Sequence, residues 1–268
     1  YARLVRVHVV PSLGNVKLSK LVPAHLQGFY RDKLDSGLSP RTVQYLHVVL
    51  HRALKQALRW GMVPRNVADA VDPPKVDKKE VSPLSPAQAR TFLEVARGDR
   101  LEALYVLAIH TGMRQGELLG LKWDDVDLDA GVLRVRGTKT ARSRRSVKLS
   151  QKALQALHGH LQRQLGEIDR AGSSWQENGL VFATTSGTPM DRHNLLRQFK
   201  RLLGETGLPA IPFHNLRHTC ATVLLSKGMH AKFVQELLGH SNIAITLDTY
   251  SHVLPGMGDG LADAMDDL

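Results

Sequence analysis

Residues 213–252 read FHNLRHTCATVLLSKGMHAKFVQELLGHSNIAITLDTYSH and are the most informative stretch of the chain. The pattern predicts a helix that begins near Asn215. His214 and Arg217 stand three residues apart at its start, so both side chains project from one face. An imidazole beside a guanidinium suits acid/base work and the binding of an anion. The same stretch ends near a phenol, Tyr250.

A second histidine, His240, lies where the next helix ends, and the β-branched and polar run from Asn242 to Thr249 leads to Tyr250. Tyr250 is a candidate nucleophile, although a lone tyrosine is more often half-buried packing. His218, four residues after His214, also allows a zinc pair. Neither an H-E-x-x-H glutamate nor a thiolate cluster is present to complete such a site.

Upstream, residues 110–127 read HTGMRQGELLGLKWDDVD and carry Arg114. An apolar helix over 102–111 ends at Gly112 and a new helix starts, so the guanidinium emerges at a helix junction. Its planar, permanently charged fork suits bidentate contact with a phosphate. Glu117 offers the competing interpretation, in which Arg114 is only a structural ion-pair partner.

Between these segments, residues 132–135 and 144–149 alternate as two strands around a turn that carries Lys139. Residues 131–148 hold seven basic side chains and no acidic one. Desolvation lowers a lysine's pKa, so Lys139 could donate a proton to a leaving oxygen; alternatively, the loop contacts backbone phosphates only. The residues expected to contact DNA are Arg41, Arg52, Lys55, Arg134, Arg136, Arg142, Arg144, Arg145 and Arg192.

Composition narrows the class of partner. The 268 residues include 36 Lys and Arg against 25 Asp and Glu, a net charge of +11, and residues 1–75 alone carry +8. A basic N-terminal part indicates a polyanionic partner.

The single cysteine, Cys220, excludes an internal disulfide and suits a reducing cytosol. No apolar run reaches the roughly 18 residues of a membrane helix.

The predicted fold is mainly α-helical with a small β-sheet, in two domains. Residues 1–72 are expected to form a helical domain, residues 73–84 a proline-rich linker, residues 85–254 a mixed α+β domain and residues 255–268 a C-terminal tail. The helices are expected at 1–10, 23–36, 39–60, 66–71, 85–96, 102–111, 116–121, 151–166, 191–206 and from 215 onward. Residues 124–129 are expected to form an acidic turn.

Four segments, TGMRQGELLGLKW, GTKTARSRRSV, HNLRHTCATVLLSKG and ELLGHSNIAITLDTYSHV, together resemble the catalytic boxes of the tyrosine recombinase family, in particular integrases of phages and integrative elements. Their order and spacing match that family as well. The preceding segments PSLG, GLSPRTV and GMVPRNVAD resemble the family's core-binding, DNA-contacting domain. The resemblance covers nearly the whole chain.

The resemblance implies a role for each residue of a catalytic set. Tyr250 would attack the scissile phosphate to form a 3′-phosphotyrosyl link, Arg114 and Arg217 would hold the non-bridging oxygens, and Lys139 would protonate the leaving oxygen. His214 would serve as acid/base toward the tyrosine, and His240 would donate a hydrogen bond to the phosphate. The set implied is Arg114, Lys139, His214, Arg217, His240 and Tyr250, with no cofactor or metal.

The resemblance also implies partners. It predicts double-stranded attachment or core sites as substrate, a homotetramer on DNA, a DNA-bending host factor and an excisionase. The tail would dock on a neighbouring protomer, and the setting would be the bacterial cytosol or nucleoid, with phage or mobile-element origin. Because Tyr1 falls inside an expected helix and relatives carry an arm-type DNA-binding domain ahead of it, a segment upstream is expected.

Two alternative functions stay open on the sequence alone. A type IB topoisomerase resembles the same catalytic domain and shares its chemistry, but relaxes DNA as a single protein. A DNA-binding regulator without catalysis needs only basic helices and a basic hairpin. Formation of a covalent protein–DNA adduct separates the regulator from both enzymes.

Overall fold

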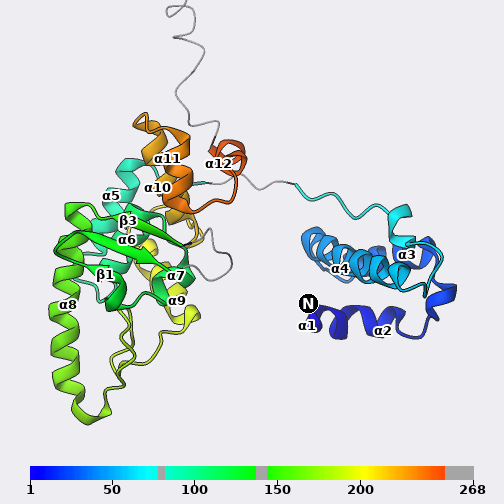
Figure 1. The fold of residues 1–268 in the computed structure, drawn as a ribbon, viewed down its shortest axis with the longest axis horizontal. Coiled ribbons are helices and arrows are strands. Elements are labelled where there is room, and N and C mark those ends of the chain that lie inside the picture. Colours follow the sequence, from blue (N-terminus) through cyan, green and yellow to red (C-terminus); the bar gives the residue numbers. More distant parts are fainter. Residues whose placement is uncertain (78–81, 137–143, 251–268) are drawn as a thin grey trace, which may run out of the picture. The chain divides into compact units, whose positions relative to one another are not determined.

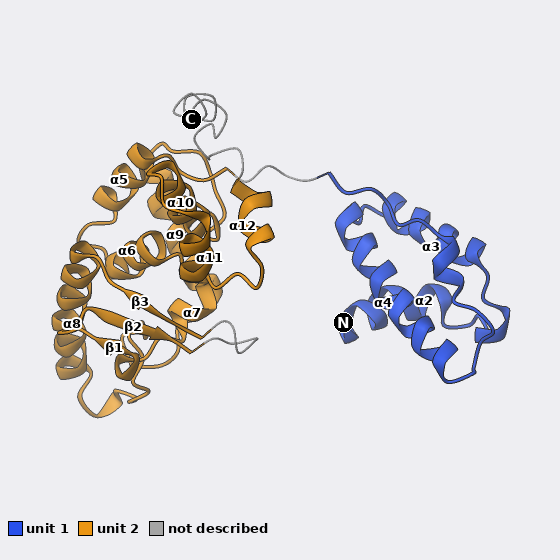
Figure 2. Ribbon diagram, turned by 45° about the horizontal axis from the view of Figure 1, so that its top comes forward, with its two compact units in different colours: residues 1–80 blue, residues 81–268 orange. Residues whose placement is uncertain are grey.

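The structure is a computed structural model that describes residues 1–77, 82–136 and 144–250 of the chain. The chain divides into two compact units, residues 1–80 and residues 81–268 (Figure 2). Lys139, Arg142 and the predicted tail lie outside the described residues. The functions expected for the two domains stay predictions.

The first unit is a small bundle of helices. Its elements are α1 (Ala2–Leu4), a π-helical segment (Val5–Val9), α2 (Val10–Leu13), a 3₁₀ turn (Leu18–Lys20), α3 (Pro23–Asp35), α4 (Pro40–Arg59) and a second 3₁₀ turn (Val67–Ala70). The longest, α4, starts where expected because the Ser39 hydroxyl accepts a hydrogen bond from the Thr42 amide and Pro40 occupies the first helical position. Leu46 of α4 and Leu26 of α3 are fully buried in the core between them.

The second unit contains the remaining helices and the sheet (Figure 1). Its helices are α5 (Pro86–Val95), α6 (Glu102–Thr111), α7 (Gln115–Leu119), α8 (Gln151–Ala171), α9 (Arg192–Glu205), α10 (Asn215–Ser226), α11 (Ala231–Leu238) and α12 (Ile243–Tyr250), with 3₁₀ turns at Trp123–Asp125 and Gly172–Ser174. The mainly helical fold class with a small sheet is confirmed.

The sheet has three antiparallel strands in the order β1 (Val126–Asp127), β2 (Val132–Val135) and β3 (Arg145–Lys148). The prediction of a hairpin from β2 and β3 is confirmed, with Leu133 opposite Val147. The prediction of a turn throughout 124–129 is wrong in part, because β1 pairs with β2 through Val126 opposite Leu133. A two-residue strand is too short to show an alternating pattern in the sequence.

The central helix is α6, which is buried along almost its whole length and packs against α8 and α10. It ends at Gly112, whose φ of +61° favours glycine. A side chain at Gly112 would also collide with Leu238 of α11. Because Gly112 has no side chain, its backbone can approach α10 and α11 closely.

Two elements differ from the prediction. Helix α8 continues past Gly166 to Ala171, since Glu167 in the added turn is held by an ion pair with Arg100. The prediction of helices from residue 215 onward gives no bounds for the β-branched and polar run from Asn242 to Thr249, and residues 243–250 form α12, with Thr246 and Tyr250 buried on one face. Packing against α10 and α11 outweighs the low helix propensity of its β-branched residues.

Candidate active site

The Tyr250 side chain is held in the interior of the second unit. It is 1% exposed and packs against Leu225, Val234 and Leu238 of α10 and α11. Its hydroxyl lies 2.6 Å from Nδ1 of His218. Burial raises the pKa of Tyr250 to about 12, and the positive charge of Arg217 opposes this rise. The phenol is therefore protonated at neutral pH.

Arg217, on the first turn of α10, is a buried guanidinium with only 3% of its surface exposed. It donates hydrogen bonds of 2.7 Å to the carbonyl oxygens of Gly112 and Leu238. Burial lowers its pKa to about 10, and the charges of Arg114 and Arg145 act in the same direction. Arg217 thus stays charged at neutral pH, with two of its five N–H donors in use.

Arg114 directly precedes α7. Its placement fits both interpretations that the sequence leaves open, a structural ion pair with Glu117 and a contact with phosphate. Nη1 forms an ion pair of 2.8 Å with Glu117, and Nη2 donates to the Gly239 carbonyl at 3.3 Å. Yet 39% of the Arg114 side chain is exposed. Arg114 is a structural partner of Glu117 that still presents part of its guanidinium to solvent.

Arg145, at the start of β3, lies in this same network rather than on the surface. Nε donates to the Leu237 carbonyl at 2.6 Å, and Nη2 lies 3.0 Å from Glu117. The side chain is 8% exposed, so the DNA contact predicted for Arg145 does not fit its placement. The signal was present in the sequence: Arg145 shares the strand face of Val147 and Leu149, which point into the core.

The three arginines converge on the C-terminal end of α11. The consecutive carbonyls of Leu237, Leu238 and Gly239 accept from Arg145, Arg217 and Arg114, in that order. Such carbonyls lack partners within a helix, and the helix end carries partial negative charge. Glu117 balances part of the positive charge. Burial raises its pKa, but hydrogen bonds and the charge of Arg145, together with hydrogen bonds from Arg114, outweigh burial and lower the pKa.

The predicted histidines border this cluster. His240 follows the α11 end, and its Nδ1 lies 2.8 Å from the Thr246 hydroxyl of α12. Burial, followed by the charges of Arg217 and Arg114, lowers the pKa of His240 to about 4. The same causes lower the pKa of His214, which precedes α10. The structure therefore brings together five of the six predicted catalytic residues, and the two imidazoles are neutral at neutral pH.

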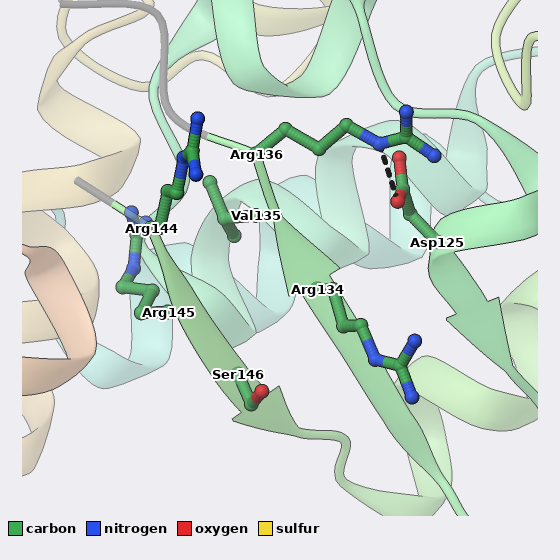
Figure 3. A pocket seen from close by; sticks show the side chains of 7 residues that line it. All are labelled: Asp125, Arg134, Val135, Arg136, Arg144, Arg145 and Ser146. Atoms are coloured by element: carbon green, nitrogen blue, oxygen red, sulfur yellow. Dashed lines mark hydrogen bonds and ion pairs between the residues drawn. The ribbon is translucent and has the colours of Figure 1, made fainter. Parts of the chain in front are cut away.

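Basic side chains also surround a pocket on the β2–β3 face (Figure 3). Arg134, Arg136 and Arg144 are exposed there, and Nε of Arg136 lies 2.6 Å from the buried carboxylate of Asp125. The pocket is lined by Asp125, Arg134, Val135, Arg136, Arg144, Arg145 and Ser146. Three exposed arginines against one aspartate favour an anionic ligand.

The other predicted DNA-contacting residues are exposed as well. Arg41, Arg52 and Lys55 lie on α4 of the first unit, and Arg192 is the first residue of α9 in the second. The Arg41 guanidinium lies 5.1 Å from the ring centre of exposed Tyr45. These residues are accessible, and their contacts with DNA stay predictions.

The described residues lack the features of a metal site, a reactive thiol and a membrane-spanning helix. Within them, no group of three or more His, Cys, Asp and Glu side chains could hold a metal ion. Burial raises the pKa of Cys220 to about 12, which leaves an unreactive thiol. Among the helices of the described part, none is long and apolar enough to cross a membrane.

A first test concerns the arginine network. We expect Arg145→Met to lower the free energy of unfolding by about 3–5 kcal/mol, because it leaves the Leu237 carbonyl unpaired and removes one partner of buried Glu117. Its exposed neighbour provides the control, and Arg144→Met should change stability by less than about 0.5 kcal/mol. Urea unfolding followed by circular dichroism measures both. Equal losses would contradict the network.

Comparisons with known proteins identify a family and relatives of the chain. Residues 82–256 match the phage integrase family. The chain is 34% identical to a tyrosine recombinase XerC-like protein of Caldanaerobacter subterraneus, over 96% of this chain and 73% of the relative. It is 33% identical to an integrase of Streptomyces ambofaciens, over 92% and 69%. The Tn1549 transposon integrase in complex with circular intermediate DNA has a TM-score of 0.77 at 26% identity, over 98% and 91%.

Proposed function

The chain belongs to the phage integrase family of site-specific DNA recombinases, and we propose that it breaks and rejoins DNA through a covalent bond to Tyr250. One observation carries the proposal. Residues from four separate elements, Arg114, Arg217, His214, His240 and Tyr250, gather around the C-terminal end of α11. Two guanidiniums, two neutral imidazoles and a phenol are five of the six groups that this chemistry requires, and the Lys139 ammonium is the sixth.

In the cleavage step, the Tyr250 oxygen forms a bond to phosphorus while the bond from phosphorus to the 5′ oxygen breaks. The products are a 3′-phosphotyrosyl link and a free 5′-hydroxyl. The phenolic proton passes to His214, and Lys139 supplies the proton of the leaving oxygen. Rejoining reverses both transfers, so the protein link conserves the energy of the phosphodiester and no nucleotide is consumed.

The arginines stabilise charge that develops on the non-bridging oxygens. Arg217 uses two N–H groups for carbonyls, and Arg114 uses two for Glu117 and Gly239, which leaves donors on each for a phosphate. Donors already fixed by the fold need no reorganisation when charge develops, and this favours the transition state. In the tautomer whose Nδ1 accepts from the Thr246 hydroxyl, neutral His240 carries its N–H on Nε2, where it can donate to the phosphate.

The substrate proposed is double-stranded DNA carrying attachment or core sites. Support comes from the exposed basic residues of α4, of α9 and of the pocket in Figure 3. Each protomer supplies one Tyr250, and exchange between two duplexes breaks four strands, so we propose a homotetramer on DNA. A DNA-bending host factor, an excisionase and a place in the bacterial cytoplasm belong to the same proposal, by resemblance to integrases.

The test uses a plasmid with two candidate attachment sites and a supercoiled plasmid with one. We expect recombinant product from the first, while the second keeps its superhelical density, because exchange requires two assembled sites. Gel electrophoresis of both products over one time course measures this. Relaxation of the one-site plasmid without recombinants would favour the topoisomerase alternative. Retarded mobility alone, with no strand breakage, would favour the regulator.

A further inference from the structure

His218 is the direct partner of the Tyr250 hydroxyl. It follows Arg217 on α10, and its Nδ1 lies 2.6 Å from the Tyr250 oxygen, across 32 residues of sequence. The two rings are also in contact, with centroids 5.6 Å apart. Neither the catalytic set implied by resemblance nor the proposed cleavage step uses His218.

We assign the phenol as the donor of this hydrogen bond and His218 Nδ1 as its acceptor, in the imidazole tautomer that carries its own proton on Nε2. Burial, followed by the charges of His214 and Arg217, lowers the pKa of His218 to about 4, so the imidazole is neutral at neutral pH. A neutral imidazole can accept through one nitrogen, and the Tyr250 phenol, which is protonated, can donate. Transfer of the proton would be strongly uphill between groups with these two pKa values. His218 therefore holds the hydroxyl without activating it.

The residue that binds the hydroxyl, His218, lies one helical turn along α10 from His214. His214 and His218 are four residues apart on one face of α10, and their rings meet edge to face at 5.0 Å. The charge of Arg114 influences His214, whereas among the arginines only Arg217 influences Tyr250. Because Tyr250 is 1% exposed, a DNA phosphate cannot reach its oxygen in this position.

We propose that His218 is a positioning residue that holds Tyr250 in a buried resting position, and that cleavage starts when the hydroxyl leaves His218 for the site bounded by His214, Arg114 and Arg217. The inference deepens the proposed function and rests on it for the second step. Helix α12 is suited to this movement, since it is short and joins α11 through residues 239–242. Only Thr246 and Tyr250 of α12 are buried.

The test compares two substitutions in the full chain. His218→Phe keeps a ring of similar size and removes the acceptor, while His218→Asn keeps an acceptor close to the place of Nδ1. His158→Phe, at an exposed position on α8, is the matched control. Hydrogen exchange of residues 243–250 is measured without DNA. The rate of adduct formation is then measured in a single turnover on a nicked half-site DNA.

We expect His218→Phe to accelerate both exchange in α12 and adduct formation by about 5- to 10-fold, the equivalent of one hydrogen bond. His218→Asn should return both rates toward those of the parent, and His158→Phe should change neither. Slower adduct formation in His218→Phe would overturn the proposal, as would unchanged exchange in α12. Faster exchange, with no adduct even in the parent, would support the resting contact while the proposed function failed.

Discussion

Tyr250→Phe is expected to reduce formation of the protein–DNA adduct by at least about 10⁴-fold, because it deletes the only oxygen proposed to attack phosphorus. The fold should survive this change. The ring packs among apolar side chains of α10 and α11, and within the described residues the hydroxyl makes a single hydrogen bond, to His218. Losing that bond costs about 1 kcal/mol of stability. DNA affinity, which we propose rests on exposed basic residues, should stay close to that of the parent.

A second buried tyrosine supplies the control. Tyr105 is 0% exposed in the core of the same unit, and no described residue hydrogen-bonds its hydroxyl. Tyr105→Phe should therefore leave adduct formation unchanged. Denaturing gels of a nicked half-site reaction measure the adduct, and native gels measure binding. An adduct that persists in Tyr250→Phe would show that another residue attacks the DNA.

Arg217→Met is the second change with a large expected effect, on both stability and catalysis. It removes the donors of two buried carbonyls, Gly112 and Leu238. We expect the free energy of unfolding to fall by about 2–5 kcal/mol, with some relief because Arg217 is repelled by Arg114 and Arg145. Loss of a preorganised donor at the phosphate should lower the rate of adduct formation by about 10²- to 10³-fold.

Arg217→Lys tests whether the positive charge at this position is sufficient or whether the shape of the guanidinium is also needed. A lysine keeps the positive charge, but its ammonium cannot reproduce the fork that links α10 to both the end of α6 and the end of α11. We expect a loss close to that of Arg217→Met. Rates are measured at a temperature where urea unfolding shows each variant folded, with exposed Arg170→Met on α8 as control. A folded Arg217→Met protein with parental rates would remove Arg217 from the proposed chemistry.

Local signals explain which parts of this site could be predicted from the sequence. The end of α6 at Gly112, the start of α10 after His214 and the β2–β3 hairpin each depend on neighbouring residues, and the structure has each of them at that place. The prediction that Arg145 contacts DNA follows from the basic residues around it in the sequence. The alternation with buried Val147 was the better guide to its position.

Other features depend on contacts between distant segments. Residues 243–250 have low helix propensity, and α12 forms because Thr246 and Tyr250 pack against neighbouring helices. The pair of His218 and Tyr250 joins two helices that no local pattern relates. The order in which Arg145, Arg217 and Arg114 bind three successive carbonyls likewise requires the assembled fold.

The most direct test of the central claim is to identify the atom that carries the DNA. A nicked half-site oligonucleotide is incubated with the protein, the adduct is digested with trypsin and nuclease, and the modified peptide is sequenced by mass spectrometry. The account predicts a nucleotide joined through its 3′ phosphate to Tyr250, together with a free 5′-hydroxyl on the released strand. A 5′-phosphoryl link, or a nucleotide on any other residue, would contradict it.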